Sequence, residues 1–73
     1  MKKLTEIKKG EKAKVSKILC GHALKQRLSS MGIHSGEMLE VIKNDHGPLI
    51  VKVFETKLVI GRGQAEKIVV DLL

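Results

Sequence analysis

The segment from Cys20 to Val41 limits what this chain can fold into more than any other, because it combines a short helix, two glycine bends and the start of a strand. Its first half carries apolar side chains at helical spacing, and these are Leu24, Leu28 and Met31. A helix this short is unstable alone in water, so its apolar face must pack against another element. Since the residues that follow have the spacing of strands, that element is predicted to be a small sheet.

Two glycines in this segment predict sharp changes of chain direction. Gly32 lies where a helix end favours a residue that tolerates positive φ. The following Ile33 would then fold back onto Leu28 in a Schellman ending. Gly36 allows a second bend before apolar residues resume at strand spacing from Leu39.

Alternating apolar and polar residues predict about five short strands, over residues 12–19, 38–43, 49–54, 57–60 and 68–71. The side chains expected to face inward are Ala13, Val15, Leu49, Val51, Val53, Leu58, Ile60, Ile68 and Val70. A break in phase at Lys17 predicts a bulge. Residues 44–48, which include Gly47, are typical of a turn, and residues 61–65 of a loop with one helical turn. The pattern favours one mainly β domain over residues 1–73, a small closed barrel with one inserted short α-helix.

The chain carries 14 basic and 8 acidic residues, a formal net charge of +6, and lysines concentrate in residues 2–17. Such an end either solubilises the domain and protects sheet edges, or attracts nucleic acid, an anionic membrane surface or an acidic protein. The single cysteine and the lack of a signal peptide are typical of a cytoplasmic protein. No apolar run approaches the ~20 residues that a membrane-spanning helix needs.

An ordered series of motifs resembles a known family. The series reads Leu28-x-x-Met31-Gly32-Ile33-x-x-Gly36-x-x-Leu39-x-Val41, then Gly47-Pro48-Leu49-Ile50-Val51-Lys52-Val53, then Leu58-Val59-Ile60-Gly61-x-x-x-Ala65-x-x-Ile68-x-Val70. Over roughly residues 4–71 it is similar to FeoA, the small cytosolic component of bacterial ferrous iron transport. The resemblance implies an SH3-like barrel with an inserted helix. It also implies a non-catalytic accessory whose partner is the cytoplasmic GTPase part of FeoB, the membrane iron permease.

The same motifs are similar to the carboxy-terminal SH3-like domain of iron-dependent repressors, so a metal-sensing or regulatory module is an alternative. The chain departs from the FeoA pattern at two places. Members often carry glycine near Glu55 and a basic residue near Gly61, and both are absent here. The departures leave open the geometry of the turn and any contact made by the missing basic group.

No grouping of residues predicts an enzyme, because acids and histidines are scattered and no phosphate-binding glycine loop with a lysine is present. A metal site is suggested only weakly, by Cys20 and His22, whose thiolate and imidazole suit zinc or ferrous iron. Further ligands would have to come from His34, His46 or an acid. The other interpretation is a half-buried thiol and a histidine at a helix start, with no resident cofactor.

Two kinds of partner remain for a chain of this type. Nucleic acid is the less favoured one, since Phe54 is the only aromatic residue and bases could not stack in series. Only salt-sensitive, low-specificity attraction to phosphates would remain. For a protein partner, the candidate contact residues are Lys25, Arg27, His34 and Arg62, although each could instead be simply solvated. Arg62 lies in a glycine-flanked loop that we expect to leave it free to move.

Overall fold

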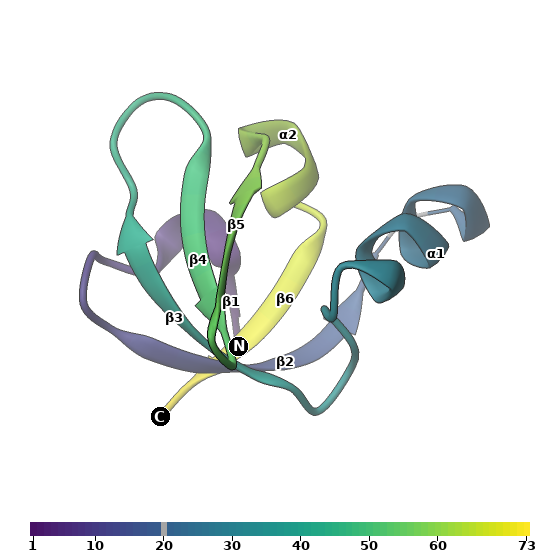
Figure 1. Cartoon of the computed structure of the whole chain (residues 1–73), viewed down its shortest axis with the longest axis horizontal. Coiled ribbons are helices and arrows are strands. Elements are labelled where there is room, and N and C mark those ends of the chain that lie inside the picture. Colours follow the sequence, from purple (N-terminus) through teal and green to yellow (C-terminus); the bar gives the residue numbers. More distant parts are fainter. Residues whose placement is uncertain (20) are drawn as a thin grey trace.

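Six antiparallel strands form one strongly curved sheet in the computed structural model, which describes residues 1–19 and 21–73 (Figure 1). The strands are β1 (Lys2–Lys3), β2 (Lys12–Ile18), β3 (Met38–Lys43), β4 (Leu49–Val53), β5 (Thr56–Ile60) and β6 (Ile68–Leu72). Their order across the sheet is β1-β6-β2-β3-β4-β5. A 3-10 turn η1 (Leu4–Glu6), helix α1 (His22–Ser30) and the short helix α2 (Arg62–Ala65) complete the fold.

The mainly β architecture with one inserted helix agrees with the sequence analysis, and the predicted bulge is also present. The register between β2 and β6 shifts between Val15 and Lys17, where the alternation breaks. Two features differ from the prediction. The sheet has a sixth strand, β1, and it is not closed, because β1 and β5 are its edges and no pairing joins them in the described residues. Pairing there is limited because β1 has only two residues, after which the chain turns into η1.

The inner face of the sheet holds an apolar core. All nine predicted inward residues lie in the core or pack against it, with Leu58 only half-buried. Leu4 and Ile7 are also fully buried, although neither was predicted to face inward. They lie in and directly after η1, which packs against α2 and β6 on the open side of the sheet. Side chains therefore cover a region that strand pairing does not close.

Helix α1 ends in the predicted Schellman motif. Gly32 has φ +92°, its N–H donates to Ser29 O at 3.0 Å, and the Ile33 N–H donates to Leu28 O at 2.9 Å. Leu28 and Ile33 are both fully buried, whereas the rest of the apolar stripe is half-buried. Gly36 makes the second bend with φ +94°. The chain therefore leaves α1 and returns along the sheet within a few residues, as the two glycines predicted.

The turn between β4 and β5 is unusual because its left-handed residue is not glycine. Val53 pairs with Thr56, so Phe54 and Glu55 alone make the reversal. Phe54 has φ 55° and is the only non-glycine residue with positive φ in the described part of the chain. A bulky side chain in this region is strained. Since Phe54 is also 75% exposed, packing within the domain compensates little for the strain.

Replacement of this residue, Phe54→Gly, should stabilise the domain. Relief of ~1–3 kcal/mol of backbone strain exceeds the ~0.5–1 kcal/mol that a glycine costs in chain entropy, so we expect a gain of about 1 kcal/mol. Thermal unfolding followed by circular dichroism should show a midpoint about 4–8 °C higher. Glu55→Gly is the matched control in the same turn and should lower the midpoint. An equal fall for both variants would show that Phe54 carries no such strain.

Candidate interaction surface beside helix α1

A hollow of about 310 Å³ lies between α1, the end of β2 and the chain that follows Gly32. Its lining includes Ile18, His22, Lys25, Ser29, Ile33 and His34. The lining combines aliphatic side chains with a lysine and two histidines, and no acidic side chain of the described residues belongs to it. An apolar floor with a basic rim suits a ligand that combines an aliphatic group with negative charge.

The local sequence explains why these side chains meet. His22, Lys25 and Ser29 follow each other at helical spacing, so they share one face of α1. The Schellman reversal then brings His34 back beside the helix, where its Nδ1 lies 3.0 Å from Ser29 Oγ. The hydrogen bond between them fixes the imidazole at the rim of the hollow. The ending at Gly32 therefore builds the surface as well as terminating the helix.

The structure brings together some of the predicted contact residues and separates others. Lys25 and His34 line the hollow, and so does His22, which the sequence suggested only as a weak metal ligand. Arg27 is exposed on α1 but does not line it. Arg62 lies elsewhere, in α2, and has a different environment.

The guanidinium of Arg62 is held by the loop between β3 and β4. Its Nη2 donates to Asn44 Oδ1 at 2.7 Å and to the Asp45 carbonyl, while Nε donates to Gly47 O at 3.1 Å. The expectation that a glycine-flanked loop leaves Arg62 free to move is therefore not met. Gly47 lacks positive φ and would have open space for a Cβ, so its part in this contact is its carbonyl oxygen.

Asn44 extends this network to the start of the chain. Its Nδ2 donates to Thr5 O at 3.0 Å and to Ile7 O at 2.7 Å. The amide therefore accepts from Arg62 with its oxygen and donates to two backbone carbonyls with its nitrogen. Together these contacts connect α2, the β3–β4 loop and the residues around η1, on the open side of the sheet.

The metal hypothesis stays a prediction. Cys20 lies outside the described residues. Within residues 1–19 and 21–73, no three side chains of His, Cys, Asp or Glu are placed to hold a metal ion together. In the same residues, no helix has the length and apolar character needed to span a bilayer.

Comparison with known proteins identifies the family. The sequence model of the FeoA domain matches residues 2–72. The chain belongs to the FeoA family. It is 47% identical over 64 residues to "Putative Fe(2+) transport protein A" of Methanocaldococcus jannaschii, which covers 88% of this chain and 78% of that protein.

Solved structures support the same assignment. The crystal structure of an iron uptake regulatory protein, FeoA, superimposes with a TM-score of 0.93 at 36% identity and covers 97% of this chain and 96% of that one. The FeoA protein of Chlorobium tepidum gives a TM-score of 0.88 at 32% identity, over 99% and 70% of the two chains. The predicted SH3-like fold is thus confirmed. A manganese-dependent transcriptional repressor, with a TM-score of 0.89 at 21% identity over 99% and 41% of the chains, shares the fold alone.

The Arg62 network predicts a selective loss of stability. Arg62→Lys should lower the free energy of unfolding by about 1–2 kcal/mol, because a single ammonium cannot replace charged hydrogen bonds made by two different guanidinium nitrogens. Urea unfolding measures this difference. Arg27→Lys is the control and should leave stability unchanged, since no side-chain hydrogen bond of Arg27 is found in the described residues. Equal stability of the two variants would contradict a structural role for Arg62.

Proposed function

We propose that this FeoA-family protein is a non-catalytic accessory of ferrous iron uptake. It works in the cytoplasm, where it binds the GTPase part of an FeoB-like permease and reaches the membrane only through that partner. The family's place in ferrous iron transport supports the general role. The hollow beside α1 supports contact with a protein as the means.

The observation that carries this proposal is the composition of the hollow. Lys25, His22 and His34 surround a floor that contains Ile18 and Ile33, and no described acid offsets the basic groups. A folded protein can fill such a surface by presenting an aliphatic side chain next to a carboxylate. We therefore expect the transporter to contribute an acidic segment that carries at least one aliphatic residue.

The interior of the domain supports binding rather than catalysis. Every buried residue in the described chain is apolar. Enzyme sites commonly hold titratable groups that burial and charged neighbours perturb, and the core of this domain supplies none. The exposed side chains around α1 are those that we propose for the contact with a protein partner.

Charge reversal at the rim tests the proposal. Lys25→Glu should weaken binding to the purified cytoplasmic part of the transporter at least about tenfold, because the new carboxylate repels the acidic segment. Isothermal titration calorimetry, with guanosine diphosphate and with a non-hydrolysable triphosphate analogue, measures the effect. Lys57→Glu, on β5, gives the same change in net charge outside the hollow and is the control.

Binding of the wild-type protein to the transporter tests the accessory role, and binding of the variants tests whether the hollow is the contact site. No binding in either nucleotide state, together with normal ferrous iron uptake after deletion of the protein, would refute the accessory role. Binding that is weakened equally by Lys25→Glu and Lys57→Glu would keep the partner and refute the hollow as the contact site.

A further inference from the structure

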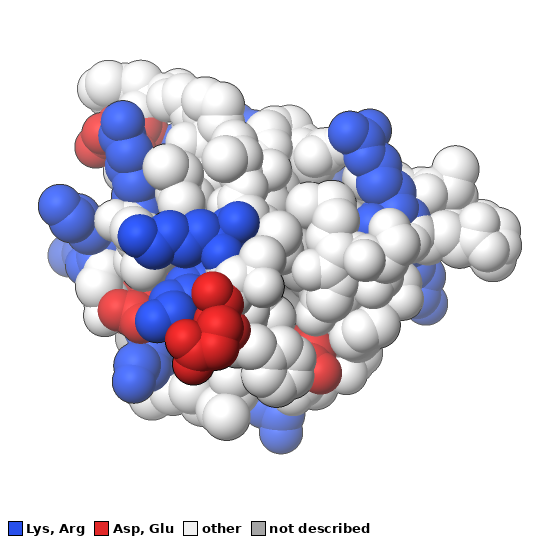
Figure 2. Space-filling model, viewed as in Figure 1, with Lys and Arg blue, Asp and Glu red and all other residues white. Residues whose placement is uncertain are grey.

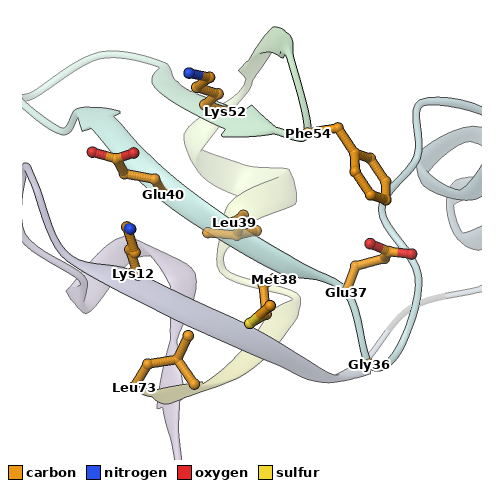
Figure 3. A pocket seen from close by; sticks show the side chains of 9 residues that line it. All are labelled: Lys12, Gly36, Glu37, Met38, Leu39, Glu40, Lys52, Phe54 and Leu73. Carbon is orange, nitrogen blue, oxygen red and sulfur yellow. The ribbon is translucent and has the colours of Figure 1, made fainter.

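A second surface, separate from the hollow beside α1, lies over the outer side of β2, β3 and β4. It is a groove of about 460 Å³ that Figure 3 shows from close by. Three large apolar side chains line it and remain exposed to water: Met38 (61%), Phe54 (75%) and Leu73 (65%). Phe54 is also the strained residue of the β4–β5 turn. Exposed apolar side chains gathered in one groove are typical of an interaction site.

Charged side chains of both signs share this groove. The strand register places Glu40 of β3 opposite Lys12 of β2 on one side and opposite Lys52 of β4 on the other. Glu37 also lines the groove. The ion pairs found in the described residues are Met1–Asp71 and Lys43–Asp45, so none of these four side chains is paired within 4.0 Å. The groove therefore offers two free positive and two free negative groups.

This balance of charge identifies the partner that the groove fits. Two copies of a chain with net charge +6 repel each other, and the rim beside α1, which holds Lys25 and no acid of the described residues, offers no opposite charge for a second copy of itself. A surface on which both signs are interleaved can pair with itself. On the face that Figure 2 shows, acidic side chains likewise lie directly beside basic ones. We propose that the groove binds a second copy of this chain.

The sheet geometry gives the arrangement. A symmetric dimer uses the same patch on both subunits. In one such dimer, the two-fold axis runs parallel to the strands, above the line between β3 and β4. This rotation places β3 of each copy over β4 of the other. Glu40 then lies opposite Lys52 of the second copy, and the same pair forms again by symmetry. Met38 lies two residues before Glu40 and Phe54 two residues after Lys52, so on these antiparallel strands both lie toward the same end of the groove, and in the dimer the thioether would lie against the aromatic ring of the second copy.

Phe54 supports this arrangement because its conformation is not explained within one subunit. The ring is 75% exposed and its backbone is strained. In the dimer the ring is buried between the subunits, and burial of an aromatic side chain offsets the strain. The same residue therefore lowers the stability of the single subunit and contributes to association.

The size of the surface sets the expected strength. Standard interfaces bury about 800 Å² on each partner, whereas the whole domain exposes 4572 Å². The groove is only a small part of that area, so the dimer belongs to the weak class of interfaces. We expect a dissociation constant on the order of 100 μM, and association should be observed in samples that extend to about 1 mM.

The decisive experiment uses complementary charge reversals. Glu40→Lys alone should place lysine against lysine at both symmetric contacts, and Lys52→Glu alone should place glutamate against glutamate. Each should weaken self-association at least about tenfold, as measured by sedimentation equilibrium. Mixing the two variants should restore association as a heterodimer, because both contacts then join opposite charges. Isotope labelling of one variant, followed by NMR, identifies the heterodimer directly.

Matched controls separate local contact from net charge. Glu66→Lys and Lys67→Glu are exposed, lie outside the groove and make the same changes in net charge. Neither should disrupt the dimer beyond a small effect of net charge, and their mixture should gain nothing. Phe54→Gly should also weaken dimerisation although it stabilises the subunit, a combination that no unfolding effect produces.

Three results would overturn the proposal. They are a wild-type protein that stays monomeric at about 1 mM, variants that are folded but do not associate when mixed, and a loss of transporter binding in Glu40→Lys while the wild-type protein is monomeric. The last result would assign the groove to a different protein. Because the groove and the hollow beside α1 share no lining residue, the groove can fail while the proposed transporter contact stands, and the reverse also holds.

Discussion

The reversal of the chain at Gly32 is the constraint on which the rest of the structure depends. Its positive φ ends α1 and closes the Schellman hydrogen bonds. The same reversal buries Ile33 in the core and presents His34 to the face of the helix that carries Lys25. Any residue other than glycine there would strain the reversal, so the fold and the hollow beside α1 depend on the same backbone geometry.

The sequence predicted the sheet best where burial alternates along a strand, as it does in β3 and β4. The predicted strand over residues 38–43 coincides with β3, and the inward set along β4 is buried as expected. Local pattern was weaker at the start of the chain. Leu4 and Ile7 lie in and directly after a 3-10 turn in a lysine-rich segment, where neither helical nor strand spacing marks a residue as buried. The sixth strand and the open edge were missed for the same reason.

In the candidate site, too, residues joined by a local motif could be predicted, whereas residues placed by distant contacts could not. Lys25 and His34 could be placed near each other because a local motif, the helix ending, joins them. The position of Arg62 could not be predicted, since it depends on Asn44, 18 residues away, whose carboxamide also reaches Thr5. Phe54 was predicted only as the single aromatic residue and as the end of the strand over residues 49–54, whereas β4 ends at Val53 and Phe54 belongs to the turn. Its strain and exposure became visible only together, in three dimensions.

The hollow beside α1 and the groove over β2, β3 and β4 differ in charge, and therefore in the partner that we propose for each. The rim beside α1 holds Lys25 and two histidines with no acid among the described residues, so the partner proposed for it is one that presents acidic groups. The groove over β2, β3 and β4 interleaves both signs, so it can pair with itself although the chain as a whole is basic. Since the groove and the hollow beside α1 share no lining residue, a dimer joined through the groove would leave the hollow of each copy available. Two linked hollows bind a transporter that has two matching sites more tightly than one does, because the second contact becomes intramolecular.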